Sequence, residues 1–476
     1  MNARDRLDRI ILPLALTIGT AARVVFALVD DGIHWPDEIY QSLEPAHRAV
    51  FGYGWQAWEF LEGARHWSFP GLVALVLKTA LLFGLRSPAE YLPFLELFFC
   101  TVGTATIAST YLLSRSVGAS RLSSALGAAS FAFMGLAVYF APRAMGETLS
   151  ALPVTLAFAL LLLDAPRRWH LVAAGVLLSL AVGFRLQNGL LCLGALGVLL
   201  ARRRRTDALW LLGVLGLGAL AYGLVDWLTW GKPFHSALVY LRFNVLEGRS
   251  SDFGRSPPWH YLRVLVSAEW LTVVPLVGLA VLGFRRHRAL AVLSLVYLLA
   301  HSLIPHKELR FLFPLFPLLC AQAAVGLDVL SASRPRWAPA VAVGLSLASL
   351  LSCATLPALT FRRLGIKNPG PGNRSALDYA GAENRLLLFA SALPDVCGLK
   401  ISSIENWRTG GYTYFHQEVP LYGRERPNDG EGHYNYLIAP KGSVAGTEVA
   451  ADGEVALVRL SPPPCAPDPG YDWHLE

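Results

Sequence analysis

Charged side chains are scarce in this chain of 476 residues, because Asp, Glu, Lys and Arg together make up only 16% of it. A soluble domain is closer to about a quarter charged. The hydrophobic share of 54% and the mean hydropathy of +0.43 point the same way. This composition excludes a single soluble domain and a disordered chain, and six cysteines over such a length exclude a disulfide scaffold. The sequence therefore predicts a polytopic membrane protein.

Two further absences narrow the function. The chain has no glycine-rich phosphate loop of the Walker or dinucleotide type, so we expect neither a nucleotide site nor an organic cofactor. The formal net charge is +7, but no basic run is interleaved with aromatics as a nucleic-acid surface requires. Nucleic acid is therefore not an expected partner. Basic cytoplasmic loops of a membrane protein account for the charge.

Long apolar runs fill the first three quarters of the chain. Ile10–Val29 is longer than the apolar core of a cleavable signal, which predicts an uncleaved anchor with its N-terminus inside. A membrane span needs roughly 20 mostly apolar residues. The runs predict eleven spans in all, and the other ten lie at about 91–113, 122–141, 147–163, 169–184, 187–201, 207–228, 263–284, 289–304, 309–330 and 337–357.

Short loops rich in arginine alternate with the other connections, and the positive-inside rule places these arginines in the cytoplasm. They are Arg115, Arg121, Arg167, Arg168, Arg202 to Arg205, Arg285, Arg286, Arg288, Arg334 and Arg336. Eleven spans then put the C-terminus outside. Gly71–Leu85 is apolar but short, so we expect a re-entrant or interfacial helix on the outer face. The basic loop 229–262 also falls outside under this scheme and runs against the charge rule.

The sequence predicts a membrane domain over residues 1–357, which includes one long external loop, and an external tail. These are the loop 30–90 and the tail 358–476, where Leu386–Ala390 and Glu454–Leu460 indicate a small α/β or β-rich external domain. The tail carries Cys397 and Cys465, for which a disulfide and two buried thiols both stay open.

Polar clusters from five places in the chain fall on the outer face in this topology. They are His34-Trp35-Pro36-Asp37-Glu38, Arg65-His66, Arg143 with Glu147, Arg185-Leu186-Gln187-Asn188 and His306-Lys307-Glu308-Leu309-Arg310. Any one cluster alone is more simply explained by side chains that snorkel to the interface. Five on one side predict a functional site, because ionisable groups at a membrane boundary are costly to desolvate.

The adjacent carboxylates Asp37 and Glu38 supply a general base beside a second acid, or oxygen ligands for a divalent cation, and we do not predict the cation. Pro36 ahead of them is also typical of an ordinary helix start. The aromatic stretch around Trp58 fits sugar stacking and the interfacial belt equally well. Glu44 and Glu59 within it either bond sugar hydroxyls or are simply solvated.

The late cluster predicts a phosphate site. Lys307 and Arg310 lie three residues apart, so on a helix they share one face, and His306 adds a third potential cation. Arg185 is a second candidate for phosphate and Arg143 a weaker third. Substrate contacts are expected from the polar and aromatic residues of the outer face, namely His34, Gln41, Glu44, Trp58, Glu59, Arg65, Arg143 and Glu147.

At these residues the chain resembles a known family. The run from Pro36 to Glu44, then Phe51–Gly54 and Trp58-Glu59, is similar to the first outer loop of the Alg9-like mannosyltransferases, glycosyltransferase family 22 of the GT-C fold. His306–Phe311 is similar to that family's HKEERF-type motif, with Leu309 in place of its second acidic residue. Within the family, the chain looks most like the GPI third-mannose transferases (PIG-B-like). Scarce lysine and abundant arginine and alanine are typical of a bacterial member.

The resemblance implies a multispanning enzyme in the cell (inner) membrane. It implies a polyprenyl-phosphate mannose donor, a glycolipid or glycan acceptor, transfer on the non-cytoplasmic face with inversion, and Asp37 as the general base. Other donor sugars, such as arabinose or galactose, stay open. A transporter or flippase of lipid-linked sugars is the alternative from another class, but it needs polar paths to both faces, whereas the polar clusters are one-sided.

Overall fold

The structure is a computed structural model that describes residues 3–366, 375–424, 430–460, 466 and 468–475. The chain divides into two compact units. The helical unit comprises Met1–Phe26, Phe99–Pro142 and Gly146–Arg374. The loop–tail unit comprises Ala27–Phe98, Arg143–Met145 and Ser375–Glu476. The loop 30–90 and the tail, which are far apart in sequence, therefore belong largely to one unit.

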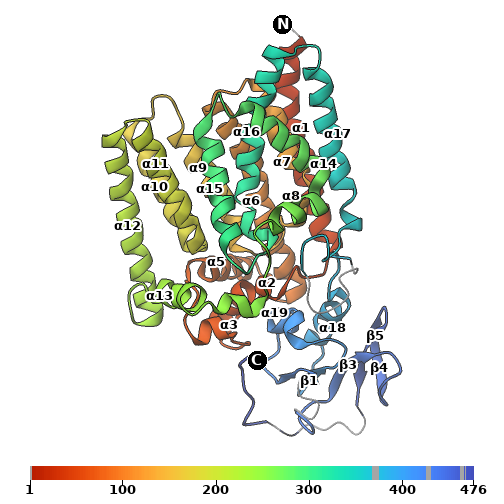
Figure 1. Cartoon of the computed structure of the whole chain (residues 1–476). Helices are drawn as coiled ribbons and strands as arrows, with labels where there is room; N and C mark the ends of the chain where they lie inside the picture. Colours follow the sequence, from red (N-terminus) through yellow and green to blue (C-terminus); the bar gives the residue numbers. More distant parts are fainter. Residues whose placement is uncertain (1–2, 367–374, 425–429, 461–465, 467, 476) are drawn as a thin grey trace. The chain divides into compact units, whose positions relative to one another are not determined.

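Helices make up the helical unit, as expected where lipid leaves no water to bond the backbone. They are labelled in Figure 1 and are α1 (Ala3–Val29), α6 (Pro88–Ser116), α7 (Arg121–Phe133), α8 (Gly135–Tyr139), α9 (Gly146–Leu161), α10 (Arg168–Phe184), α11 (Gly189–Ala201), α12 (Arg205–Trp230), α13 (His235–Leu241), α14 (His260–Gly283), α15 (Arg288–Leu303), α16 (Leu315–Ser333) and α17 (Ala338–Ala354). Two of these helices are divided between the units. Helix α1 belongs to the helical unit up to Phe26, and α6 belongs to it from Phe99 onward.

Membrane spans are recognised among these helices by length and composition. Within the described residues, five helices are long and apolar enough to cross a bilayer, and six shorter apolar helices of 10–17 residues accompany them. The five are Ile10–Val29, Pro88–Ser116, Arg205–Trp230, His260–Gly283 and Leu315–Ser333. The chain is thus a multi-pass membrane protein, while the count of eleven spans stays a prediction.

Several of the expected spans are wrong as continuous helices. Within 263–284, for example, Glu269 has non-helical backbone (φ −143°, ψ 28°), which kinks α14. The run 122–141 is broken at Met134, whose extended backbone (φ −60°, ψ 121°) separates α7 from α8. The run 309–330 begins as the 3₁₀ turn η5 (Leu309–Leu312), and α16 starts only after Pro314. Lys307 and Arg310 both precede that helix, so the expectation that they share a helix face is also wrong.

Close packing of α14 on α16 shows how the helical unit is held together. A Cβ atom added at Gly326 of α16 would lie 1.8 Å from the carbonyl oxygen of Leu279 in α14. Only glycine allows this approach, and small residues at such crossings let helix backbones meet where lipid supplies no hydrophobic drive. Figure 1 also shows α10, α11 and α12 side by side, and each of α10 and α11 packs on α12.

The loop–tail unit combines short helices with one sheet. Its elements are α2 (Pro36–Glu38), the π-helix η1 (Ile39–Leu43), α3 (Glu44–Phe51), α4 (Trp58–Leu61), α5 (Ser68–Leu82), α18 (Gly381–Ser391), β1 (Leu399–Ile401), α19 (Gly411–Phe415), β2 (Leu421–Tyr422), β3 (Tyr436–Pro440), β4 (Thr447–Asp452) and β5 (Val455–Arg459). The five-stranded sheet has the order β2-β1-β3-β5-β4. Strand β1 pairs parallel with both neighbours, and β5 pairs antiparallel with both of its own.

The tail matches the α/β expectation with one local error. Glu454–Leu460 contains β5, as predicted, but Leu386–Ala390 lies in helix α18 rather than in a strand. A short apolar run cannot by itself distinguish a helix from a strand. Here Leu386, Leu387 and Ala390 are buried, and α18 packs against β4 and β5. Cys465 lies outside the described residues, so both alternatives for Cys397 and Cys465, a disulfide and two thiols, stay open.

Candidate functional site

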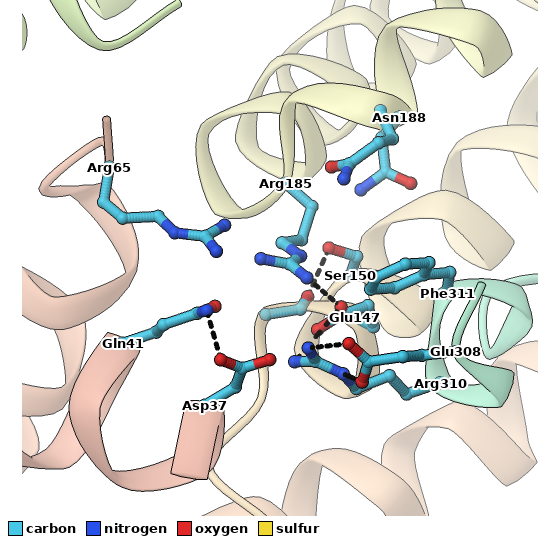
Figure 2. A network of polar contacts seen from close by, with 12 residues as sticks. Asp37, Gln41, Arg65, Glu147, Ser150, Arg185, Asn188, Glu308, Arg310 and Phe311 are labelled. Carbon is cyan, nitrogen blue, oxygen red and sulfur yellow. Dashed lines mark hydrogen bonds and ion pairs between the residues drawn. The ribbon is translucent and has the colours of Figure 1, made fainter. Parts of the chain in front are cut away.

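Asp37 is positioned at the start of a helical segment in the loop–tail unit. Trp35 has extended backbone (φ −162°, ψ 158°), and Pro36 then opens the short helix α2. The Asp37 carboxylate is half-buried, and the side-chain amide of Gln41 donates to its Oδ1 over 2.5 Å (Figure 2). Because Gln41 lies one turn further along the same helical segment, the amide fixes the orientation of the carboxylate.

Gln41 also connects Asp37 to the second half of the loop. Its Nε2 donates to Glu59 Oε1 over 3.0 Å, and Arg65 Nη2 lies 3.5 Å from the same oxygen. Burial raises the pKa of Glu59, while Arg65 opposes this shift. The structure therefore brings together four of the residues expected from the sequence in a single polar chain. Trp58 begins α4 next to Glu59 and is half-buried.

Glu38, in contrast to its neighbour Asp37, is buried and bonded to the protein. Its Oε2 accepts the backbone N–H of His34 at 2.7 Å and lies 3.5 Å from Nη1 of Arg143. Arg143 also forms an ion pair with Asp30 and donates to the carbonyl of Gly32. Burial raises the pKa of Glu38, and Arg143 counteracts it. This geometry indicates that Glu38 and Arg143 hold the segment 143–145 against the loop.

Glu44 is fully buried and joins the first loop to the tail. Its Oε1 accepts the backbone N–H groups of Trp55 (2.9 Å) and Tyr412 (3.2 Å). Its Oε2 accepts both the backbone N–H and the hydroxyl of Thr413, at 2.9 and 2.7 Å. With both oxygens bonded to the chain, Glu44 favours a structural role over the substrate contact expected from the sequence.

The buried Glu44 predicts a pH dependence of stability. Burial raises the pKa of this carboxyl group to about 7 from 4.5. The folded protein thus keeps a proton that the unfolded chain loses between these values, so stability falls as the pH rises through this window. Between pH 5 and pH 8, we expect the melting temperature of the Glu44→Gln variant to fall by roughly a few degrees less than that of the wild-type protein. Thermal unfolding beside the exposed-residue control Glu62→Gln measures this, and identical slopes in all three proteins would contradict it.

The helical unit contains a separate network of buried ions. Glu147, in the first turn of α9, forms an ion pair with Arg185, which caps the end of α10 in extended conformation (φ −151°, ψ 115°). Arg310 Nη1 lies 3.6 Å from the same Glu147 oxygen. A single carboxylate therefore holds two guanidinium groups that come from distant parts of the chain, and Figure 2 shows these side chains converging on Glu147.

Glu308 is the second anion of this network. Arg310 donates to both of its oxygens, from Nε over 2.6 Å and from Nη2 over 3.1 Å, in a forked arrangement. His306 Nε2 lies 2.8 Å from Glu308 Oε1. Burial alone would raise the pKa of Glu308, but Arg310 and His306 hold it well below its usual range. Both guanidinium groups lie over the ring of Phe311, with Cζ of Arg185 and of Arg310 at 5.7 and 5.2 Å from the ring centroid.

Lys307 points elsewhere. Its ammonium group donates to the carbonyl oxygens of Ser256 (2.9 Å) and Ile304, and burial lowers its pKa. The geometry thus favours Lys307 as a support for the loop ahead of α14, while Arg185 and Arg310 form the cationic pair. Glu308 is a residue of the network that was not expected from the sequence, although it lies inside the late motif between Lys307 and Arg310. Within the described part of the chain, no group of three or more His, Cys, Asp and Glu residues is arranged to hold a metal ion.

Comparison with known proteins places the chain in a family. Residues 14–365 match the model of the Alg9-like mannosyltransferase family. The chain belongs to the Alg9-like mannosyltransferases. This confirms the resemblance drawn from the first loop and from the late motif.

Two relatives illustrate how far the similarity extends. GPI mannosyltransferase 3 of Yarrowia lipolytica is 30% identical over 68% of this chain and 64% of its own length. GPI alpha-1,2-mannosyltransferase 3 of Danio rerio is 30% identical over 64% of this chain and 58% of its own length. This Alg9-like chain therefore spans less than two thirds of the curated relatives that it matches.

Solved structures show the fold. ArnT from Cupriavidus metallidurans, bound to undecaprenyl phosphate, matches with a TM-score of 0.58 at 12% identity, over 96% of this chain and 99% of that one. The oligosaccharyltransferase of Archaeoglobus fulgidus matches with a TM-score of 0.52 at 12% identity, over 91% and 69%. Both are membrane glycosyltransferases of the GT-C fold, so the GT-C expectation for this Alg9-like protein is confirmed.

Proposed function

We propose that this protein is a mannosyltransferase that moves a mannosyl group from a polyprenyl-phosphate mannose donor to a hydroxyl group of a glycolipid or glycan. The family match over residues 14–365 carries this proposal. The names of the relatives support mannose as the sugar. The fold supports a lipid phosphate as the leaving group, since a solved neighbour is ArnT bound to undecaprenyl phosphate.

Asp37 is the general base in this proposal. Direct displacement requires one group that takes the proton of the acceptor hydroxyl. Asp37 is a half-buried carboxylate oriented by Gln41, whereas its neighbour Glu38 is buried against Arg143. We assign Glu38 to the support of the segment 143–145 and Gln41, Glu59 and Arg65 to the orientation of the base.

Arg185 and Arg310 stabilise the departing lipid phosphate. Both guanidinium groups lie within a buried network, where preorganised cations stabilise a developing negative charge more strongly than they would in water. Glu147 and Glu308 hold both guanidiniums in place through ion pairs before any substrate binds. Attack on the face of the sugar opposite the phosphate converts a β-linked donor into an α-mannoside.

A panel of donors tests the sugar and the leaving group. Purified protein is incubated with a lipid extract and with polyprenyl-phosphate mannose, polyprenyl-phosphate arabinose, polyprenyl-phosphate galactose or GDP-mannose, and the products are analysed by mass spectrometry. We expect a product one hexose heavier with polyprenyl-phosphate mannose alone. Transfer from GDP-mannose, or from arabinose or galactose donors in preference to mannose, contradicts the proposal.

The orientation in the membrane forms part of the proposal, with the substrate face and the C-terminus outside. The arginine-rich connections support this orientation, because they follow the positive-inside rule. We expect reporter fusions after Arg205 and Arg288 to read cytoplasmic, and fusions within 230–260 and after residue 360 to read external. A cytoplasmic signal after residue 360 contradicts the orientation.

A further inference from the structure

The break between α7 and α8 lies between two buried charged residues that the proposed reaction does not use. Arg23 of α1 and Glu269 of α14 are 0% and 2% exposed. Both lie within candidate membrane spans. Ionisable residues inside such spans are expensive to bury and are retained for a purpose. All the residues involved belong to the helical unit.

Arg23 binds the backbone carbonyl groups that the break sets free. In an uninterrupted helix, the carbonyls of Phe131 and Ala132 would accept the N–H groups of residues 135 and 136. Instead, Arg23 Nη1 donates to Ala132 O over 2.8 Å and Nη2 to Phe131 O over 3.4 Å. Nη1 also donates to Gly19 O of its own helix over 2.9 Å.

Glu269 binds the complementary pair of backbone groups. Its Oε2 accepts the N–H of Leu136 at 2.9 Å. The N–H of Gly135 donates to the Ser352 hydroxyl over 3.0 Å, and that hydroxyl in turn donates to Glu269 Oε1. Thr272 donates to the same oxygen over 2.7 Å. Two of the helical hydrogen bonds that are lost at Met134 are thus replaced at both their acceptor and donor ends by side chains from other helices.

Glycines make room for these side chains. A Cβ atom at Gly135 would lie 2.8 Å from the Ser352 hydroxyl and 3.2 Å from Glu269 Oε2, and one at Gly103 would lie 3.1 Å from Arg23 Nε. Contacts that short force a neighbour to move. The backbone, the cation and the anion therefore fit each other closely around the break.

The break is joined to the cationic pair in two ways. Glu147 follows the end of α8 at Tyr139 by eight residues in the chain. Phe131, before the break, and Phe140, after it, both pack on Phe313, with ring centroids 6.3 and 5.8 Å apart. Phe313 in turn donates its backbone N–H to the carbonyl of Arg310 over 2.9 Å. The direction of the chain at Met134 therefore bears on the placement of both Glu147 and Arg310.

We propose that Arg23 and Glu269 are positioning residues, which hold the α7–α8 break in a fixed geometry and thereby place Glu147 and Arg310 for the donor phosphate. The part that concerns the phosphate rests on the proposed function. The part that concerns the break does not, so each can fail without the other.

Hydrogen–deuterium exchange of the purified full-length protein tests the break without any substrate. We expect Glu269→Leu to speed exchange in peptides covering 134–147 by about tenfold or more, since the Leu136 amide loses its acceptor. Arg23→Met should also speed exchange in these peptides. Glu269→Gln should stay near wild type, because its carbonyl still accepts from Leu136 and its amide donates to the hydroxyls. Ser352→Ala should show a smaller effect, and its control Ser346→Ala, whose hydroxyl bonds Ala342 of the same helix α17, none.

Binding of undecaprenyl phosphate to the same variants tests the positioning role. We expect Glu269→Leu and Arg23→Met to weaken this binding about tenfold or more, with Glu269→Gln and Ser346→Ala unchanged. Unchanged exchange at 134–147 in Glu269→Leu, or a rise spread evenly over all helices, overturns the inference about the break. Faster exchange with unaltered binding overturns the positioning role. Wild-type protein that does not bind the lipid phosphate contradicts the proposed function, while the exchange result still decides the role of the two residues at the break.

Discussion

The Asp37→Asn variant is expected to lose most of its turnover, by about 10²–10⁴-fold, with its fold intact. The amide is nearly the same size as the carboxylate, and Oδ1 can still accept the 2.5 Å bond from Gln41. Only the capacity to take a proton disappears. The expected change is therefore in the turnover number, measured as the initial rate of mannosyl transfer at saturating donor and acceptor.

A matched control separates this effect from a general loss of acidic charge in the loop. Glu62 follows α4 in the same loop and is exposed, so Glu62→Gln should retain wild-type turnover. Glu38→Gln should instead lower the melting temperature, because it weakens the buried contact with Arg143. Wild-type turnover in Asp37→Asn, with equal thermal stability, would remove Asp37 from the mechanism.

Replacement of Arg310 by lysine is expected to raise the KM for the donor by about tenfold or more while the KM for the acceptor stays the same. The guanidinium bonds both oxygens of Glu308 and also lies near Glu147, at 3.6 Å. A lysine ammonium is a point charge that cannot form this fork. Arg185→Ala should have an effect of the same kind, because Arg185 is the second partner of Glu147.

Initial rates against donor concentration, at fixed acceptor, measure this effect. The exposed Arg334 supplies the control, and Arg334→Lys should leave both KM values unchanged. If Arg310 only snorkelled towards the interface, Arg310→Lys would be nearly silent, since lysine snorkels as well. A donor dependence that is unaltered in both Arg310→Lys and Arg185→Ala therefore contradicts phosphate binding at this network.

Local patterns predicted those parts of the protein that depend on neighbouring residues. The apolar runs predicted the helices of the membrane part, and Pro36 was recognised as typical of a helix start, where the structure has the helix that carries Asp37. The late motif indicated the cationic Arg310. In each case the signal lies within a few residues, so composition and spacing suffice.

Long-range contacts account for what the sequence did not predict. Residues 122–141 are apolar on both sides of Met134, so hydropathy indicates one span, while the backbone groups freed at the break are bonded by Arg23 and Glu269 from other helices. From the sequence, Glu44 could be a solvated loop residue, whereas in the structure the backbone N–H groups of Tyr412 and Thr413 of the tail donate to its carboxylate. Likewise, the ammonium group of Lys307 donates to the carbonyl of Ser256, 51 residues away in the chain, and not to the network around Arg310. Such partners are not apparent from a single sequence.

The anomeric configuration of the product tests the proposed mechanism most directly. Polyprenyl-phosphate β-mannose labelled with ¹³C at the anomeric carbon is incubated with the wild-type protein and acceptor, and the isolated product is examined by NMR. A single displacement with Asp37 as base predicts an α-mannoside, with one polyprenyl phosphate released for each mannose transferred and about 10²–10⁴-fold slower product formation by Asp37→Asn. A β-mannoside, or transfer without release of the lipid phosphate, would contradict it.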